Sequence, residues 1–216
     1  AVLFGFVFPQ ILNGLDPVLA TVIGSIVILL VNMHLSHGIN KKTFVAFLST
    51  FVGLILVYVF AKFFVALTQL SGQASDEAAL LFQTTDQIAL PAGLLLATII
   101  LGATGVLDDI TITQSETVGE LIDTNPAMDR KEIYQRAMRI GRHHIASVVN
   151  TLVLAYAGVA MPLFLLFMLR EDIGILRFIN EEVVAEEIVR TIAGTLALVL
   201  LVPLSTWFAV MAQKKR

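Results

Sequence analysis

Long apolar runs alternate with short polar links along the chain. Runs with at most one charge cover residues 17–36, 43–70, 88–107, 145–169 and 191–213, and a shorter run opens the chain at 1–14. About 20 apolar residues span the hydrocarbon core of a bilayer when they form a helix. A helix is favoured there because it satisfies its own backbone hydrogen-bonding groups. The pattern predicts an all-α, polytopic bundle of about six membrane helices, in which 1–14 is too short to span fully.

Composition supports a membrane location. Of the 216 residues, 57% are hydrophobic and 14% are charged, and the mean hydropathy is +0.86. A soluble domain carries roughly 25% charged residues, so a soluble fold is excluded. The chain has no cysteine, which excludes disulfides and thiolate metal sites. We interpret 1–216 as a single transmembrane domain. Because the chain begins inside an apolar run, we expect it to be the C-terminal part of a longer polypeptide.

The segment 117–144 is the one polar stretch long enough for a helix outside the bilayer. Asn125-Pro126 or Asp129 can start that helix, and apolar residues then recur at helical spacing with Arg and Lys beside them. The predicted element is an amphipathic cytoplasmic link between the fourth and fifth spans, lying on the anionic membrane surface. Its apolar positions are Ile133, Ala137 and Ile140, and its basic ones are Arg130, Lys131, Arg136, Arg139 and Arg142.

Most basic residues fall on one side of the predicted bundle. The links 37–42 and 117–144 and the tail 214–216 hold most of the 14 Lys and Arg residues, whereas 71–87 and 170–190 are mainly acidic. Alternate links lie on alternate sides of a membrane, and short cytoplasmic loops are enriched in Lys and Arg. We therefore predict a multi-pass protein with the bilayer as its surroundings and a cytoplasmic C-terminus.

Two adjacent carboxylates, Asp108 and Asp109, follow the fourth apolar run without a basic anchor. If the helix continues to Glu116, so that the span covers 88–116, both acids lie inside the membrane boundary. An intramembrane acid is stable only with a partner or a proton, because an apolar medium disfavours its charged form. This is the property that a proton carrier requires. Asp108 and Asp109 are therefore the predicted proton- or ion-coupling residues.

A second interpretation places the two acids in the headgroup region. About 20 residues already span the hydrocarbon when counted from Ile88. A helix that ends near Asp108 would then leave both carboxylates at the membrane surface. The two interpretations differ in whether the helix continues well past Asp109.

Small residues mark the faces on which neighbouring helices are expected to pack. On the fourth span, Gly102, Gly105 and Asp109 share one helical face. The fifth span has a stripe that includes Ser147 and Gly158. These glycines and Ser147 are the predicted helix-packing residues.

Polar residues near these stripes are the predicted support of the acids. Asn150 and Thr151 on the fifth span, together with Thr111 on the fourth, can hydrogen-bond within the bilayer. One interpretation is that Asn150 and Thr151 only tie two helices together. The other is that they contact Asp108 or Asp109 and stabilise one protonation state.

Three ordered segments resemble the YibE/F-like family of bacterial membrane proteins: GATGVLDDITITQSETVGEL at 102–121, IGRHHIASVVNTLVLAYAG at 140–158 and EEIVRTIAGTLALVLLVP at 186–203. The resemblance covers nearly the whole chain and implies a location in the bacterial inner membrane. In that family Asp108 is the expected acid of the fourth span, whereas Asp109 is often apolar. His143 stands where the family usually has Asp, which puts a role of that position in doubt here.

A more distant pattern is similar to one transmembrane half of RND-type exporters and SecD/SecF. The shared order is a fourth span ending in Asp-Asp, a basic link, a fifth span with a small polar stripe and a sixth span with proline. In those systems acids of the fourth span relay protons. The similarity implies proton coupling at Asp108 and, secondarily, Asp109. It also implies a homo-oligomer, expected to be a dimer, or a fused second half.

The predicted function is a proton-coupled membrane transporter or a transport-energising subunit, with no feature that names a substrate. The alternative is a non-catalytic membrane scaffold or anchor subunit. An intramembrane enzyme is disfavoured, because an aspartyl protease needs facing acids on different helices and no Ser–His pair is suitably placed. No cofactor, metal cluster, phosphate loop or nucleic-acid motif is found, and the basic residues follow a membrane surface.

Overall fold

The computed structural model describes residues 1–85, 91–169 and 174–213, and every element in those ranges is helical. In chain order the elements are a π-helical turn η1 (Leu3–Val7), α1 (Phe8–Leu12), α2 (Pro17–His37), α3 (Lys41–Thr68), α4 (Asp76–Thr84), α5 (Pro91–Thr124), α6 (Arg130–Val159), α7 (Met161–Met168), α8 (Ile175–Ile179) and α9 (Glu182–Gln213).

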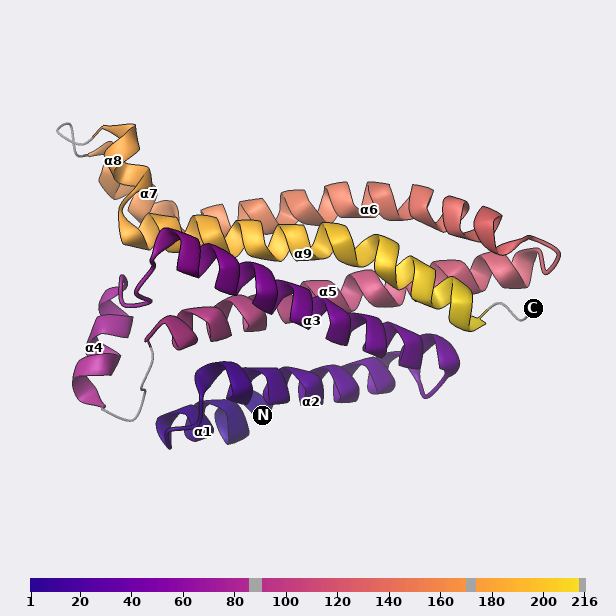
Figure 1. The fold of residues 1–216 in the computed structure, drawn as a ribbon, viewed down its shortest axis with the longest axis horizontal. Coiled ribbons are helices and arrows are strands. Elements are labelled where there is room, and N and C mark those ends of the chain that lie inside the picture. Colours follow the sequence, from indigo (N-terminus) through magenta and orange to yellow (C-terminus); the bar gives the residue numbers. More distant parts are fainter. Residues whose placement is uncertain (86–90, 170–173, 214–216) are drawn as a thin grey trace.

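The five long helices run side by side as an elongated bundle (Figure 1). The α2–α3 and α5–α6 connections lie at one end with the end of α9, and we call this the α2–α3 end. The short helices α4, α7 and α8 lie at the opposite end, the α4–α8 end. Helices α3, α5 and α9 contact one another along the centre, α2 packs on α3 and α5, and α6 packs on α5 and α9.

Four described helices are long and apolar enough to cross a bilayer: α2, α3, α5 and α9. The pair α6 and α7 makes a fifth if it counts as one span bent by 59°. The predicted all-α membrane bundle is therefore confirmed. The first apolar run forms only the short helix Leu3–Leu12, in agreement with a segment too short to span.

Side-chain caps fix where three of these helices begin. The carboxyl group of Asp16 accepts a hydrogen bond from the amide of Leu19, and Pro17 takes the first position of α2. Asn40 caps α3 in the same way. Asp129, one of the two predicted start points, caps α6 by accepting from the amide of Glu132 at 2.7 Å.

The link between the fourth and fifth spans differs from the prediction of a separate surface helix. Helix α5 continues to Thr124, and α6 runs unbroken from Arg130 into the fifth apolar run. Two of the three apolar positions of the link are buried within the protein: Ile133 and Ala137 pack with Val118 of α5 and with the last turns of α9. Ile140 is 48% exposed. Packing against two helix ends therefore covers the first part of the stripe.

Two predicted span boundaries also change. The fifth apolar run, predicted as 145–169, is interrupted at Ala160, just before Pro162, which lacks the N–H needed to continue the helical ladder. The helix that contains the sixth apolar run begins before residue 191, because α9 starts at Glu182. The expected start of the fourth span at 88–90, Arg170 and the basic tail 214–216 lie outside the described residues.

Candidate functional site

Asp108 lies near the middle of α5 and is only 8% exposed. Helix α5 continues for more than four turns beyond it, to Thr124. The acid therefore belongs to a long helix packed in the centre of the bundle, and the interpretation in which the helix ends near Asp108 is wrong.

Charged contacts on either side of Asp108 indicate its depth along α5. Towards the α4–α8 end, Arg190 of α9 donates to the Thr98 hydroxyl at 2.9 Å. Towards the α2–α3 end, the ammonium group of Lys42 lies 3.5 Å from the carboxylate of Glu116. Thr98 and Glu116 are about 27 Å apart along a helix, close to the thickness of a hydrocarbon core. Along the helix axis, Asp108 lies about 15 Å from Thr98 and about 12 Å from Glu116.

One oxygen of the Asp108 carboxyl group has a protein partner. The side-chain amide of Asn32 on α2 donates to Oδ2 at 2.9 Å. The buried oxygen Oδ1 has no hydrogen-bond partner among the described residues. Burying a polar atom without a partner costs free energy. For a carboxyl group this cost is smaller when the group carries a proton and is neutral.

Asp108 belongs to a stripe of buried polar residues that follows α5. Its other members, all no more than 4% exposed, are Thr104, Thr111, Gln114 and Ser115. Each contacts a different part of the bundle. The Thr104 hydroxyl donates to that of Ser25 on α2, and the Gln114 amide donates to the Thr206 hydroxyl of α9 at 2.6 Å.

Thr111, predicted as a supporting residue, is fully buried beside Asp108. Its hydroxyl lies 2.6 Å from the hydroxyl of Thr50 on α3 and 3.1 Å from the backbone carbonyl of Asp108. Thr111 therefore joins α5 to α3 one turn from the acid. It does not contact the carboxyl group itself in any of these hydrogen bonds.

Asp109 has a different environment from Asp108 although it is the next residue. Consecutive helical residues point about 100° apart, so Asp108 faces α2 while Asp109 is exposed on the outside of α5. On the same exposed face lie Gly102 and Gly105. The two predicted coupling acids are thus one buried and one exposed group.

Asn150 and Thr151 do not reach the acids. Both side chains are exposed on α6, and the Thr151 hydroxyl donates to the Ser147 carbonyl of its own helix. The face of α6 that meets the bundle is apolar, and its central residue is Leu152, which packs with Ile110 of α5. The prediction that Asn150 and Thr151 contact Asp108 or Asp109 is therefore not met. The side chain that contacts Asp108 is instead that of Asn32 on α2.

Among the predicted packing residues, Gly102 lies close to α6, whereas Gly105, Gly158 and Ser147 do not bring helices together within the described structure. A Cβ atom at Gly105 or Gly158 would meet no heavy atom of the described structure within 4 Å, and Ser147 is exposed. A Cβ atom added at Gly102 would lie 3.2 Å from the hydroxyl oxygen of Tyr156 on α6. Close approach occurs instead at Gly53, where a Cβ would lie 2.7 Å from Leu201.

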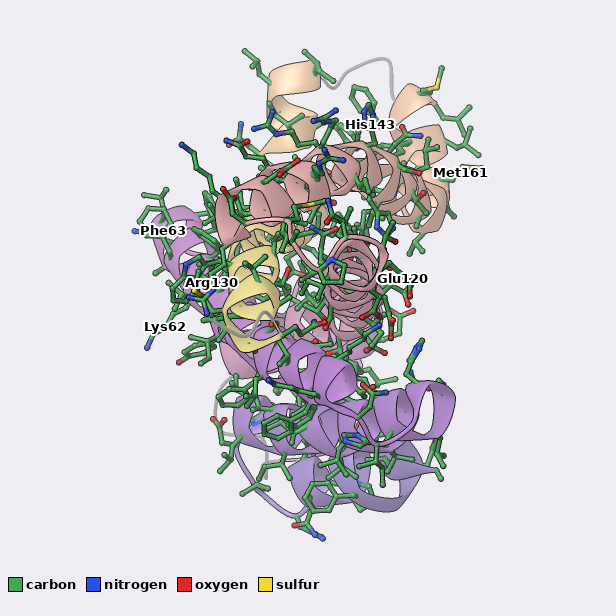
Figure 2. The ribbon with its side chains drawn as sticks, turned by 90° about the vertical axis from the view of Figure 1, so that its right-hand side faces the viewer. Lys62, Phe63, Glu120, Arg130, His143 and Met161 are labelled. Carbon is green, nitrogen blue, oxygen red and sulfur yellow. The ribbon has the colours of Figure 1, made fainter. Side chains whose placement is uncertain are left out.

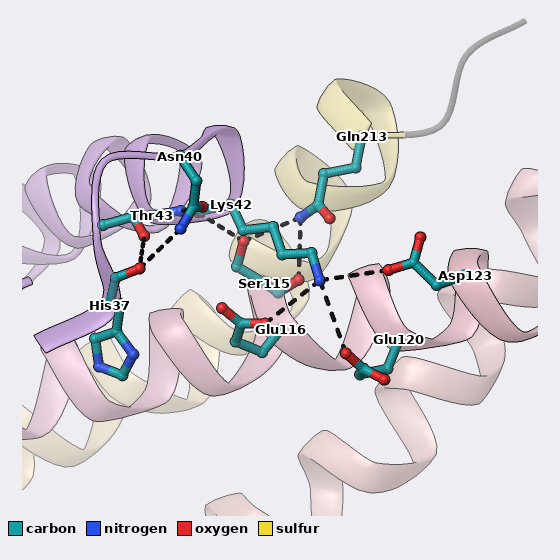
Figure 3. A network of polar contacts seen from close by, with 9 residues as sticks. All are labelled: His37, Asn40, Lys42, Thr43, Ser115, Glu116, Glu120, Asp123 and Gln213. Atoms are coloured by element: carbon teal, nitrogen blue, oxygen red, sulfur yellow. Dashed lines mark hydrogen bonds and ion pairs between the residues drawn. The ribbon is translucent and has the colours of Figure 1, made fainter. Parts of the chain in front are cut away.

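A cluster of ion pairs lies between the buried acid and the end of α5. The ammonium group of Lys42 is 3.5 Å from Glu116, 3.8 Å from Glu120 and 3.6 Å from Asp123 (Figure 3). The Ser115 hydroxyl donates to the Lys42 carbonyl and thereby holds the same turn of α3 against α5.

The surfaces of α5 and α6 carry further charged residues. Figure 2 shows Glu120 projecting from α5 on the side away from α9, and His143 on the outer side of α6. His143 is exposed, so this position is remote from the buried carboxyl group. The described residues contain no group of three or more His, Asp or Glu side chains arranged to hold a metal ion.

Sequence reasoning missed Asn32, the partner of the buried acid. The sequence contained a feature that could have identified Asn32, because it is a lone amide near the end of the apolar run 17–36. A polar residue in such a run usually has a partner on another helix. The sequence did not indicate which helix supplies that partner, since this depends on which faces of α2 and α5 meet.

Comparison with known proteins gives a family. No curated protein and no solved structure matches the chain. The family model described as YibE/F-like protein matches residues 1–215, in agreement with the three segments identified in the sequence. The chain therefore belongs to the YibE/F-like protein family.

Proposed function

We propose that this protein is a proton-coupled membrane transporter, or a subunit that energises transport, in which Asp108 carries the proton. The observation that supports this most directly is the state of the carboxyl group. It is buried near the middle of α5, has one amide donor in Asn32, and has a second oxygen without a described partner. An ionisable group at such a depth costs several kcal/mol unless it pairs or binds a proton.

The surroundings of Asp108 suit a group that changes its protonation state. The Asn32 amide donates to the carboxyl group and so favours its charged form, whereas burial favours the neutral form. The carboxyl group thus has one interaction that favours each of its two forms. The buried hydroxyl and amide groups of the α5 stripe supply further hydrogen-bonding partners along the helix.

Proton flux into liposomes tests the proposal. The purified protein is reconstituted, a pH gradient is imposed, and flux is followed with an entrapped pH-sensitive dye. We expect Asp108→Asn to reduce flux to that of empty liposomes, because the amide has nearly the same shape but cannot release a proton. The matched control is Asp76→Asn, which removes an exposed carboxylate from α4 at the α4–α8 end. Wild-type flux in Asp108→Asn, with unchanged thermal stability, would overturn the proposal.

A non-catalytic scaffold is the second candidate function. It is favoured by the dense fixed contacts at the α2–α3 end, where Lys42 and Ser115 join α3 to α5 and Gln213 joins α9 to the same turn of α5. Such contacts suit a static anchor. In the flux experiment a scaffold gives equal, background values for the wild type and for Asp108→Asn.

We assign the α2–α3 end to the cytoplasm of a bacterium and place the chain in the inner membrane. The support is the excess of Lys and Arg in the links at that end. A single cysteine at Ile39, which is exposed in the α2–α3 link, tests the orientation. An impermeant thiol reagent added to intact spheroplasts is expected to leave it unmodified and to modify it after lysis.

We also propose that a second copy of the chain covers the exposed face formed by α5 and α6. Asp109 and Asn150 are exposed there, and lipid chains offer such groups no hydrogen bonds. The open glycine at position 105 allows another helix to approach closely. Oxidative cross-linking of Gly105→Cys should give a dimer, with Val59→Cys on α3 as an exposed control. Cross-linking of neither variant, or of both equally, would contradict the proposal.

A further inference from the structure

A hollow of about 680 Å³ opens at the α2–α3 end of the bundle. Its walls come from the last residue of α2, the second half of α5, the α5–α6 connection and the first half of α6. The lining combines the apolar side chains of Ile112, Leu121, Met128 and Ile140 with charged and polar ones that include His37, Thr113, Glu116, Thr117, Glu120 and Arg136. The charged and polar groups need hydrogen-bonding partners, which water supplies and lipid chains do not.

The hollow leads along α5 towards the acids. Thr113 lines it and lies one helical turn from Asp109 on the same exposed face of α5. Ile112 also lines it and is one turn from Asp108.

The opposite side of Asp108 is closed by apolar side chains. A single buried cluster fills the bundle towards the α4–α8 end, and its members from α5 are Leu95, Ile99, Ile100, Ala103 and Leu107. They pack against apolar residues of α3 and α9. Hollows at that end include an apolar one of about 270 Å³ and one of about 400 Å³ that Gln69, Asn180 and Glu182 help to line. The second lies where α3 ends and α9 begins, so the apolar cluster separates it from Asp108.

We propose that the larger hollow is a water-filled vestibule, through which ions in the solution at the α2–α3 end reach Asp109 and then Asp108. The described conformation is thus open to one side of the membrane and closed to the other. This assignment adds a direction of access to the function proposed above. The proton use of Asp108 rests on that function, whereas the hydration of the vestibule does not.

The titratable and charged groups around the vestibule come from four helices. They make its wall acidic overall, which concentrates cations, protons included, near the entrance. Lys42 offsets part of this charge by its contacts with three carboxylates of α5. The groups are His37 of α2, Lys42 of α3, Asp109, Glu116, Glu120 and Asp123 of α5, and Glu132 and Arg136 of α6.

Cysteine accessibility tests the vestibule directly, because the natural chain contains no cysteine. Thr113→Cys and Thr117→Cys place a thiol on the wall. Leu48→Cys is the matched control: Leu48 is an exposed residue of α3, two positions from Thr50, which contacts Thr111. Leu48 therefore lies at nearly the same depth in the bundle as Thr113, but on a lipid-facing surface. Gly102→Cys places a thiol on the same face of α5 as Asp109, but on the side of Asp109 towards the α4–α8 end.

The probe is a membrane-impermeant trimethylammonium thiosulfonate, applied from either side of oriented vesicles. We expect Thr113→Cys to react roughly tenfold faster than Leu48→Cys or more, since a thiolate forms only where water hydrates it. The reaction should occur only from the α2–α3 side, and Gly102→Cys should react slowly from both sides. Thr117→Cys provides the same readout should Thr113→Cys fail to fold.

Equal rates for the two vestibule variants and Leu48→Cys would overturn the vestibule, as would reaction from the α4–α8 side. The outcome is independent of transport, since labelling requires no activity. If the labelling test contradicts the vestibule but Asp108→Asn still reduces proton flux, the proposed function stands. Normal labelling without any flux would instead contradict the proposed function alone.

Discussion

The side chain of Lys42 on α3 lies directly over Gly119 on α5. A Cβ atom at position 119 would overlap the Cε and Nζ atoms of the lysine. The absence of a side chain at Gly119 therefore lets the lysine cross the helix and reach carboxylates in three successive turns. This contact holds the start of α3 against α5 beside the proposed vestibule.

The first prediction concerns the strength of this contact. We expect Lys42→Met to lower the melting temperature in detergent by a few degrees at low salt, because exposed ion pairs contribute only about 0.2–1 kcal/mol each. The difference from the wild type should nearly vanish in 1 M salt, where the Debye length is about 3 Å. Gly119→Ala should behave like Lys42→Met, since it displaces the same ammonium group.

Thermal unfolding at two salt concentrations provides the measurement, and Lys41→Met serves as a control because Lys41 is the adjacent, exposed lysine. A salt-independent loss in Lys42→Met would show that its alkyl chain, and not its charge, stabilises the contact. Full stability of Gly119→Ala would mean that Lys42 finds another route to the carboxylates.

The second prediction concerns Asn32 and Asp108, which lie 2.9 Å apart across α2 and α5. Asn32→Ala leaves a buried carboxyl group without its donor, which should lower the free energy of unfolding by about 1–3 kcal/mol. Asp108→Ala should cost less, because the more exposed amide of Asn32 can turn to other partners. A double-mutant cycle should give a coupling of about 1 kcal/mol. Additive effects of the two substitutions would contradict a direct interaction.

The third prediction compares the same substitution at two glycines. Gly53→Val inserts its side chain against Leu201 and Leu107 at the crossing of α3 with α9 and α5. Overpacking of this kind should destabilise the bundle by about 1–3 kcal/mol. Gly105→Val enters open space and should leave monomer stability within about 1 kcal/mol of the wild type. Unfolding in detergent gives both values, and equal losses at the two positions would be inconsistent with the described packing.

The apolar runs predicted most of the fold, because the bilayer imposes a length and a composition on each crossing helix. The limits of α2 and α3 fall within two residues of the predicted spans 17–36 and 43–70. The prediction failed where a helix continues past its apolar run. Segment 117–144 reads as a surface helix because its charges flank an apolar stripe, yet Ile133 and Ala137 are buried by the ends of α5 and α9.

The candidate site was predicted in part. An acid after an uninterrupted apolar run was sufficient to single out Asp108, and the structure buries it. Asp109 was given the same role, although it lies on the exposed side of α5. Neighbouring residues on a helix share a sequence context but not a direction, so the sequence did not separate them.

The sequence by itself determined that this protein is a bundle of membrane helices, because a helix crosses hydrocarbon with all its backbone hydrogen-bonding groups satisfied. Only the tertiary structure decided that α5 continues past Asp108, that Asn32 is the partner of this acid, and that Gly53 and Gly119 are among the glycines at which elements approach closely. Those choices depend on which helix faces meet. Apolar helices with similar stripes can meet in many ways, and packing of particular side chains selects one of them.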